Sequence, residues 1–232
     1  MGSYVIAGGT KGIGAAITRQ LLSEGHHVTI LARESSNDPT LQAAEFVAWD
    51  AREGVLPALT LDRIDGAVYC PGTIRLKPFH RFTVAEYMED WQINALGAAL
   101  FLQALHKPLT AHASSSVVLF STVAVQQGMS FHASIAMAKG AIEGLGRSLA
   151  AEWAPHVRVN TIAPSLTQTP LAEKLLASPD KIEAGNKRHP MGRVGQPEDL
   201  ASLACFLLGP QSSWITGQVI GADGGMSHVR MI

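Results

Sequence analysis

Residues 3–14 read Ser-Tyr-Val-Ile-Ala-Gly-Gly-Thr-Lys-Gly-Ile-Gly, and this stretch decides the fold. Residues 4–7 form a short apolar run with aromatic and β-branched side chains, which predicts a buried strand. Glycines follow at positions 8, 12 and 14, and residues 15–24 then show the apolar period of a helix. A strand, a glycine-rich turn and a helix start create an anion site, because free backbone N–H groups and the positive helix end face a pyrophosphate.

Glycine suits this turn because side chains would block both the tight bend and the close approach of a ligand. The spacing is Gly-x-x-x-Gly-x-Gly, which differs from the Gly-x-Gly-x-x-Gly fingerprint of many dinucleotide folds. By itself the stretch is also compatible with a simple turn, so cofactor binding depends on the rest of the chain. The residues predicted to contact a cofactor here are Gly8, Thr10, Lys11, Gly12, Ile13 and Gly14.

The composition indicates one α/β domain. The chain has 232 residues, of which 47% are hydrophobic and only 16% charged, enough for a substantial core. A formal net charge of -1 without a Lys/Arg run argues against nucleic acid or an anionic membrane as partner. The low charge also favours some surface being buried between subunits. Cys70 and Cys205 lie in apolar runs, as buried thiols of a reducing compartment do, and no Cys/His cluster has the spacing of metal ligands.

The expected compartment follows from two sequence features, the position of the first strand and the length of the apolar runs. The first strand begins by residue 3 or 4, which leaves no room for a signal peptide. The longest apolar run, residues 95–102, is too short to span a bilayer. We therefore expect a cytoplasmic protein with a small-molecule substrate.

Strand and helix patterns alternate along the rest of the chain, with a loop over 34–40 and a polar segment over 172–195. The predicted elements are strands at 28–33, 46–49, 66–70, 117–120, 157–162 and 218–220, and helices at 83–106, 134–153 and 197–208. Ser134 is the expected cap of its helix. The alternation predicts a single-domain, Rossmann-like, doubly wound parallel sheet over residues 1–232, with helices on both faces. Ligands of such sheets bind at the carboxyl ends of the strands.

The end of the second predicted strand carries no acid. In NAD-binding folds an acid near this point holds the ribose 2′-hydroxyl, whereas here Ala32 and Arg33 occupy the place. A guanidinium can hold a 2′-phosphate by paired charge-assisted hydrogen bonds, and Lys11 adds a second cation nearby. Each residue alone is compatible with an ordinary surface charge. Together they favour NADP(H) over NAD(H).

Taken in order, these motifs make the sequence resemble the short-chain dehydrogenase/reductase family over essentially its whole length. The matching motifs are Thr10 to Gly14, Asp50, Asn94, residues 158–164 with Thr167 and Thr169, and residues 215–218 with 223–225. The resemblance implies that Asp50, with Ala51 beside it, lies at the adenine, and that Asn94 belongs to the catalytic set. It further implies that Pro164, Thr167 and Thr169 hold the nicotinamide carboxamide. By family analogy we expect a homodimer or homotetramer, joined through the two long helices and the carboxyl-terminal end.

Three segments depart from the family pattern. The family's strand end Asn-Asn-Ala-Gly is here Tyr69-Cys70-Pro71-Gly72, so the backbone shape can survive while the asparagine contacts cannot. Cys70, Pro71 and Gly72 remain predicted cofactor contacts. The catalytic Tyr-x-x-x-Lys is here residues 135–139, with Lys139 present and Ile135 in place of the tyrosine. Residues 33–65 look trimmed, which predicts one crossover with a shortened helix or a loop.

The missing tyrosine changes the expected chemistry. In the family that tyrosine moves a proton to or from the substrate oxygen, and the lysine holds the nicotinamide ribose and lowers the pKa of the phenol. General acid catalysis is worth roughly 10²–10⁴-fold, so ketone reduction by this route should be strongly impaired. Lys139 can still bind the ribose. Thr122, at the position of the family serine and preceded by Ser121, can still hydrogen-bond a substrate oxygen, although both can equally be strand-end turn residues.

His132 is a candidate replacement for the tyrosine. It lies three residues before Ile135 and seven before Lys139, so the three side chains can share one helix face. An imidazole can act as general acid or base near neutral pH. The alternative is that His132 is a surface residue of the first turn or precedes the helix.

Two functions remain open from the sequence. The first is an NADP(H)-dependent oxidoreductase for a small carbonyl, alcohol or imine, using Asn94, Thr122 and Lys139, with His132 or an ordered water supplying the proton. The second is an NADP(H)-binding protein without redox turnover, such as a sensor, a partner subunit or a carrier. Other chemistry on the same fold, such as elimination or epimerisation, is a third. Residues 171–195 are predicted to cover the substrate, but their mixture of apolar and cationic side chains fits too many molecules to name one.

Overall fold

The computed structural model describes residues 1–112 and 114–230. Its centre is one sheet of parallel strands in the order β3-β2-β1-β4-β5-β6-β7. The strands are β1 (Ser3–Ala7), β2 (His27–Ala32), β3 (Glu45–Ala48), β4 (Gly66–Tyr69), β5 (Ser115–Phe120), β6 (Val157–Pro164) and β7 (Val219–Ala222). The chain moves outward from β1 to β3 and then crosses back to β4 on the other side of β1. Ligands of open α/β sheets bind where the strand order reverses in this way.

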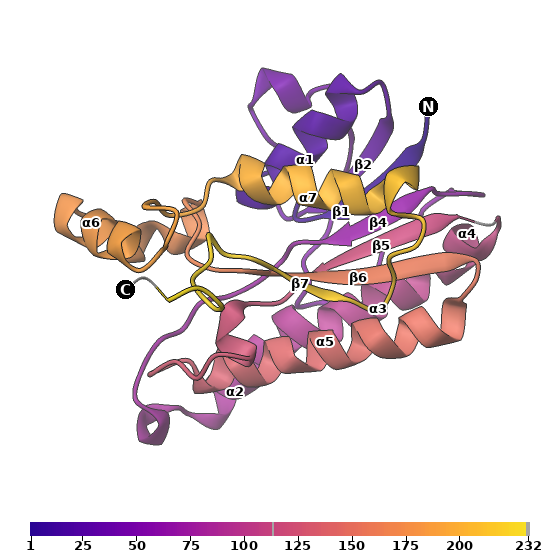
Figure 1. Ribbon diagram of the computed structural model, residues 1–232. Helices are drawn as coiled ribbons and strands as arrows, with labels where there is room; N and C mark the ends of the chain where they lie inside the picture. Colours follow the sequence, from indigo (N-terminus) through magenta and orange to yellow (C-terminus); the bar gives the residue numbers. More distant parts are fainter. Residues whose placement is uncertain (113, 231–232) are drawn as a thin grey trace.

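Helices cover both faces of the sheet (Figure 1). On one face lie α1 (Gly12–Ser23) and α7 (Pro197–Leu208), and on the other lie α3 (Gly97–Ala104) and α5 (Ala133–Trp153). The shorter helices are α2 (Val84–Trp91), α4 (His106–Thr110) and α6 (Pro179–Lys187), and α6 lies beyond the carboxyl ends of the strands. No helix in the described part of the chain is long and apolar enough to cross a membrane.

Two apolar layers hold the helices to the sheet. Ile17 of α1 and Leu200 of α7 are buried against one face, in a cluster with Val68 of β4. Phe101 of α3 and Ile142 of α5 are buried against the other. The central strands β4 and β5 are buried along their whole length. A strand covered on both faces has no polar side to alternate with, which is why these strands were readable as apolar runs.

The predicted fold class is confirmed, and of the helix predicted over 83–106 residues 84–104 are helical throughout, but its middle is π-helical. Helix α2 ends at Trp91, a π-helical segment covers Gln92–Leu96, and α3 begins at Gly97. Asn94 lies in this π-helical segment. Such segments are frequent at functional sites because the extra residue in the turn redirects a side chain. In addition, α6 forms within what the sequence showed only as a polar segment.

Ser134 is not the cap of its helix. Helix α5 begins at Ala133, and His132 occupies the N-cap position without a side-chain cap hydrogen bond. The buried Ser134 hydroxyl instead donates to Oδ2 of Asp90 at 2.6 Å. A buried carboxylate on α2 needs donors, and this requirement arises only when α2 and α5 pack together.

Both crossovers at the β3 edge are shortened, where the sequence predicted one. The connection from β2 to β3 contains a single 3₁₀ turn, Pro39–Leu41. Residues 49–65, between β3 and β4, contain no helix. The face of β3 is therefore left partly open, and its residues are mostly exposed.

Candidate functional site

Two cavities open at the carboxyl ends of the strands. The smaller has a volume of about 260 Å³ and lies beside the glycine turn and the ends of β2 and β3. The larger has a volume of about 400 Å³ and lies between the ends of β5 and β6 and residues 165–189. Gly72 and Thr73, which follow β4, line both cavities. The two cavities are therefore adjacent at this point, and we refer to the pair as the trough.

The glycine turn has a shape that only glycine permits. Gly8 has a φ of +75°, in the left-handed region that favours glycine. A Cβ on Gly14 would lie 2.2 Å from the carbonyl oxygen of Gly8, so the turn and the first turn of α1 touch without side chains between them. Lys11 is the N-cap of α1 and makes no side-chain cap hydrogen bond. The first N–H groups of the helix are thus left to a ligand, which fits the pyrophosphate of a dinucleotide.

The cations predicted to select the cofactor both line the smaller cavity. Arg33 follows β2, and Lys11 lies opposite in the turn. Lys11 Nζ forms an exposed ion pair with Glu34 Oε2 at 3.4 Å. Glu34 also lines the cavity. It is not among the residues predicted from the sequence, because its ion pair with Lys11 forms only when the end of β2 and the glycine turn lie side by side in the fold.

Most of the predicted cofactor contacts lie on the trough. The smaller cavity is lined by Gly8, Thr10, Lys11, Arg33, Asp50, Ala51, Pro71 and Gly72. The larger is lined by Ile13, Cys70, Gly72, Lys139, Pro164, Thr167 and Thr169. Gly12 and Gly14 line neither cavity. They shape the backbone of the turn that lies under the smaller cavity.

Lys139 stands at the junction of the two cavities. A Cβ on Gly72 would lie 3.6 Å from Lys139 Nζ, which donates a hydrogen bond to the carbonyl oxygen of Phe120 at 2.8 Å. Burial lowers the pKa of Lys139 to about 8, because the charged ammonium loses its water. Cys70 is its neighbour, and burial raises the pKa of that thiol to about 12.

Asn94 lies behind the junction and lines neither cavity. Its Nδ2 donates to Thr73 Oγ1 at 2.7 Å and to the carbonyl oxygen of Asp90 at 2.8 Å. Its Oδ1 accepts from the backbone N–H of Thr73 at 3.2 Å, and a Cβ on Gly72 would lie 3.2 Å from that oxygen. The amide therefore fixes the wall where the two cavities meet.

Asp90 completes this buried polar network. Its side chain is fully buried, and it accepts from the hydroxyls of Thr73 and Ser134, each at 2.6 Å. Arg75 Nη1 lies 3.9 Å from Oδ1. Neither Asp90 nor Thr73 is among the site residues predicted from the sequence. The four-residue spacing of Asp90 and Asn94 was visible, but it indicated only a shared helix face.

Ser121 and Thr122 leave the end of β5 with different partners. Ser121 Oγ donates to Glu143 Oε1 of α5 at 2.8 Å. Thr122 Oγ1 accepts from the backbone N–H of Ala124 at 3.3 Å, which leaves its O–H able to donate into the larger cavity. Of the two hydroxyls, that of Thr122 is the better placed to bind a substrate oxygen.

His132, Ile135 and Lys139 all line the larger cavity. Ile135 and Lys139 belong to α5, while His132 precedes the helix as its N-cap, which is the alternative considered for it. Ile135 is buried at the tyrosine's position, and its hydrocarbon side chain brings no acidic proton there. His132 Nδ1 lies 2.8 Å from the carbonyl oxygen of Ser130. Because a carbonyl oxygen can only accept, Nδ1 carries the hydrogen, and Nε2 is the atom that can exchange a proton. The catalytic role of His132 stays a prediction.

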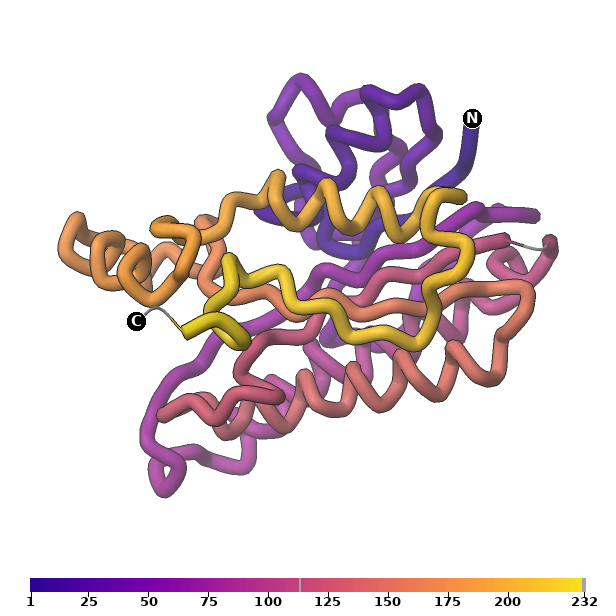
Figure 2. Tube along the Cα trace, viewed as in Figure 1, coloured from indigo at the N-terminus to yellow at the C-terminus, as the bar shows by residue number. Residues whose placement is uncertain are grey.

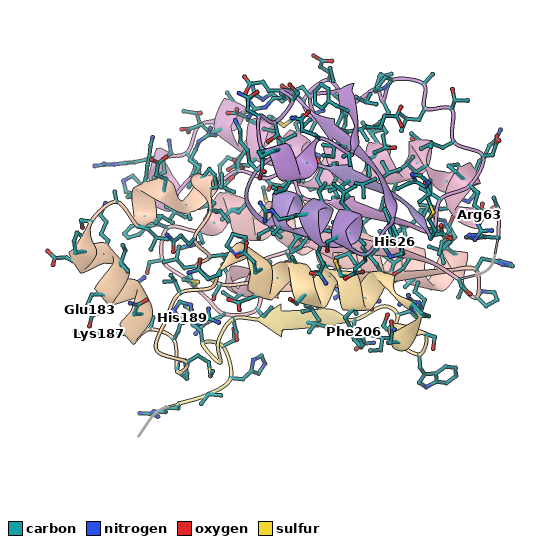
Figure 3. The ribbon with its side chains drawn as sticks, turned by 90° about the horizontal axis from the view of Figure 1, so that it is seen from above. His26, Arg63, Glu183, Lys187, His189 and Phe206 are labelled. Carbon is teal, nitrogen blue, oxygen red and sulfur yellow. The ribbon has the colours of Figure 1, made fainter. Side chains whose placement is uncertain are left out.

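Ser165 and His189 form a pair that the sequence analysis missed. Both line the larger cavity, and Ser165 Oγ lies 2.8 Å from His189 Nε2. His189 Nδ1 lies 2.8 Å from the carbonyl oxygen of Gly185, so Nδ1 carries the hydrogen and the serine hydroxyl donates to Nε2. The imidazole is only 4% exposed. No sequence signal joins residues 24 positions apart, and the pair ties the end of β6 to the residues that follow α6. Figure 3 labels His189 near the end of α6.

The carboxyl-terminal segment closes one side of the larger cavity. This segment, residues 219–230, runs beside β6 in Figure 2 and reaches the residues after α6. There the backbone N–H of Met191 donates to the carbonyl oxygen of Gly224 at 3.1 Å. Met226 of this segment lines the cavity. This side of the larger cavity therefore combines His189, after α6, with Met226, near the carboxyl terminus.

Known proteins resemble this chain over nearly all of its length. A family model described as enoyl-(acyl carrier protein) reductase matches residues 7–227. A tropinone reductase homolog of Arabidopsis thaliana is 33% identical over 244 residues, covering 96% of this chain and 91% of the relative. A solved structure described as a short chain dehydrogenase/reductase family protein has a TM-score of 0.88 at 28% identity, covering 98% of this chain and 97% of the other. A tyrosine-to-phenylalanine variant of ElxO with NADPH bound has a TM-score of 0.87 at 22% identity, covering 97% and 99%, which shows a shared fold.

Proposed function

The chain belongs to the short-chain dehydrogenase/reductase family, a family of oxidoreductases, and on that premise we propose that it is an NADP(H)-dependent oxidoreductase for a small carbonyl, alcohol or imine. The observation that carries the proposal is the trough itself. It runs from a turn suited to a pyrophosphate, past the buried Lys139, into a cavity large enough for a small substrate.

The cofactor's phosphates and adenosine fit the smaller cavity. The free N–H groups of the glycine turn would take the pyrophosphate, and Asp50 with Ala51 would contact the adenine. Arg33 and Lys11 would take the 2′-phosphate, which would exchange one ion-pair partner of Lys11, Glu34, for another. The NADPH bound by the structural neighbour ElxO supports this choice of cofactor. When bound, the cofactor supplies or accepts the hydride.

The chain's own groups would then handle the substrate oxygen. Thr122 would donate a hydrogen bond to it, and the ammonium of Lys139 would stabilise negative charge developing beside it. Ile135 cannot donate a proton. We assign that task to His132 Nε2, because the ring lies on the same cavity and its Nδ1 is already held by Ser130. An activated carbonyl or an imine, which needs a weaker acid than a plain ketone, suits this set.

The burial of Ile135 at the tyrosine's position favours one alternative. A protein that binds NADP(H) without redox turnover, as a sensor, partner subunit or carrier, would need the trough but no proton donor. Binding of NADPH with no turnover on any substrate would support it.

The decisive experiment measures NADPH oxidation with a panel of aldehydes, activated ketones and cyclic imines. Wild type, Ile135→Tyr and His132→Ala are compared, with His156→Ala as the control because His156 is exposed at the far end of α5. We expect wild-type turnover that His132→Ala abolishes and His156→Ala preserves. Turnover by Ile135→Tyr alone would show that the natural protein has lost the family's carbonyl chemistry. Unchanged turnover in His132→Ala would contradict the assigned role of His132.

We further propose a homodimer or homotetramer, joined through the long helices and the carboxyl-terminal end. Large apolar side chains are exposed there: Met137 on α5, Phe206 on α7 (Figure 3) and Trp214, which is 99% exposed. Because α5 and α7 lie on opposite faces of the sheet, we assign Met137 and Phe206 to two different contact surfaces between subunits. Sedimentation velocity at micromolar concentration tests the assembly, and a monomer there would contradict it.

A further inference from the structure

Residues 171–189 include α6 and form one wall of the larger cavity, and the Lys and Arg side chains among them that line the cavity have no acid beside them in that lining. Lys181 and Arg188 are seven residues apart with Gly185 between them, so they share one helix face, and all three line the cavity. Lys174, which precedes α6, lines it as well. The acids of the same stretch do not: they are Glu173, Asp180 and Glu183.

Glu183 lies on the face of α6 that points away from the cavity. Glu183 Oε1 lies 3.4 Å from Lys187 Nζ, an ion pair between two exposed side chains. Figure 3 shows both residues at the outer edge of the molecule. Within the described residues, Lys174 and Arg188 have no carboxylate at salt-bridge distance. Their charges remain available at the rim of the cavity.

The rest of the larger cavity carries no negative charge. Among the described residues that line it, none is Asp or Glu. Its apolar walls come from several elements: Ile74, Leu76, Met129, Leu166, Leu175 and Met226. A cleft with low-dielectric walls and charges of one sign focuses the potential and attracts the opposite charge.

We propose that the substrate is an amphiphile whose apolar carbon body lies against these walls and whose anionic group, a carboxylate or a phosphate ester, is held by Arg188 and Lys174. The inference rests on the proposed function, since it takes the larger cavity as the substrate's place. Lys181 has a supporting part, because its Nζ already donates to the carbonyl oxygen of Lys174 at 2.9 Å. Arg188 is the main anchor, since a guanidinium can bind a carboxylate or phosphate with two parallel hydrogen bonds. Lys139 is separate, because its ammonium is held by Phe120 at the inner end.

The test compares four probes with the same carbon chain: octanoate, octyl phosphate, octanamide and octylamine. Each is titrated calorimetrically into the NADPH-saturated protein. Two partly exposed cations at a rim should favour the anions by about tenfold over the amide, and octylamine should bind most weakly. If octanoate alone gains, the anion is a carboxylate. If octyl phosphate alone gains, it is a phosphate ester. Equal binding of octanoate, octyl phosphate and octanamide would overturn the proposal.

Three variants locate the effect. Arg188→Gln and Lys174→Gln should each remove a large part of the preference for the anion while leaving octanamide binding unchanged. Lys187→Gln removes the same charge from the outer face of α6 and should change nothing. If Lys187→Gln lowers anion binding as much as Arg188→Gln, the attraction is a general surface effect and the proposal is wrong.

The failures of the two proposals can be told apart. Anion-selective binding without NADPH oxidation on any substrate would leave this inference standing and remove the reductase activity. Oxidation of NADPH by neutral carbonyl compounds, together with no anion preference in calorimetry, would do the reverse.

Discussion

The two cavities of the trough are built by different means. The smaller owes its shape to the backbone: Gly8 and Gly14 allow the turn and α1 to touch, and strand ends form the rest. The larger is shaped by side chains from β5, β6, α5 and the residues around α6. The glycines that shape the first cavity follow the family pattern, although Pro71 at its edge does not, whereas Cys70 and Ile135 in the second cavity replace family side chains. A backbone cradle accepts few changes, while a side-chain cavity can exchange its chemistry and keep the fold.

The largest expected effect breaks the backbone cradle. In Gly14→Ala the new Cβ would lie 2.2 Å from the Gly8 carbonyl oxygen, so the turn must move. We expect NADPH affinity to fall by roughly 100-fold or more, since a shift of the N–H groups removes several charge-assisted hydrogen bonds. Isothermal titration calorimetry measures the affinity.

The control for that variant is Gly144→Ala in α5. A Cβ on Gly144 meets nothing within 4 Å, and the residue is exposed in the helix interior. Here we expect unchanged NADPH affinity and a gain of about 0.5–1 kcal/mol in the free energy of unfolding. Equal affinities for the two variants would show that the cradle is not what binds the cofactor.

The next effect tests the side-chain network behind the junction. Asp90→Ala leaves the buried hydroxyls of Thr73 and Ser134 without their acceptor. Losing a buried, hydrogen-bonded carboxylate should lower the free energy of unfolding by about 3 kcal/mol, measured by urea denaturation. Glu89→Ala, which removes the neighbouring carboxylate paired with Arg75, should cost much less because Glu89 is partly exposed. Equal losses would mean that Asp90 is not structurally special.

Lys139, which lines the larger cavity, should make the free energy of unfolding depend on pH. Because burial lowers its pKa to about 8 in the folded state, the folded protein releases this proton before the unfolded chain does. The unfolded state therefore binds more protons above about pH 8, and the stability contribution rises with pH until the ordinary lysine pKa is reached. Relative to Lys139→Met, the wild type should gain about 2 kcal/mol between about pH 7.5 and about pH 9.5.

The measurement is the difference in unfolding free energy between wild type and Lys139→Met at the two pH values. Taking the difference cancels groups that titrate in both proteins. A difference that stays constant with pH would contradict the burial of a charged lysine at the junction.

The smallest expected effect tests whether the smaller cavity selects NADP(H) over NAD(H). Arg33→Ala should weaken NADPH by about tenfold and leave NADH unchanged, because only NADPH carries the 2′-phosphate. Arg63→Ala is the control, since Arg63 lines neither cavity and pairs with Asp65. Equal losses of NADPH and NADH affinity in Arg33→Ala would argue that Arg33 contacts another part of the cofactor.

Much of the fold and part of the site could be predicted from the sequence. The inner strands were visible because burial on both faces makes them nearly continuous apolar runs, and the glycine turn because its residues are adjacent in the chain. Ile135 and Lys139 share one face of α5, as helical spacing indicated, whereas His132 lies at the N-cap before the helix and reaches the same cavity from there. The interruption of the helix at Gln92–Leu96 did not, because a π-helical turn keeps the same apolar composition as the α-helix around it.

What the sequence alone determined is therefore local: the elements, the cofactor turn, and the isoleucine where the family has its tyrosine. The tertiary structure decided which distant residues meet. It brought Ser134 to Asp90 across 44 positions and Ser165 to His189 across 24. It also turned Lys181 and Arg188 toward the cavity and Glu183 away from it. Such pairings depend on the order of the strands and the packing of helices against them. Neither is written in the spacing of any single segment.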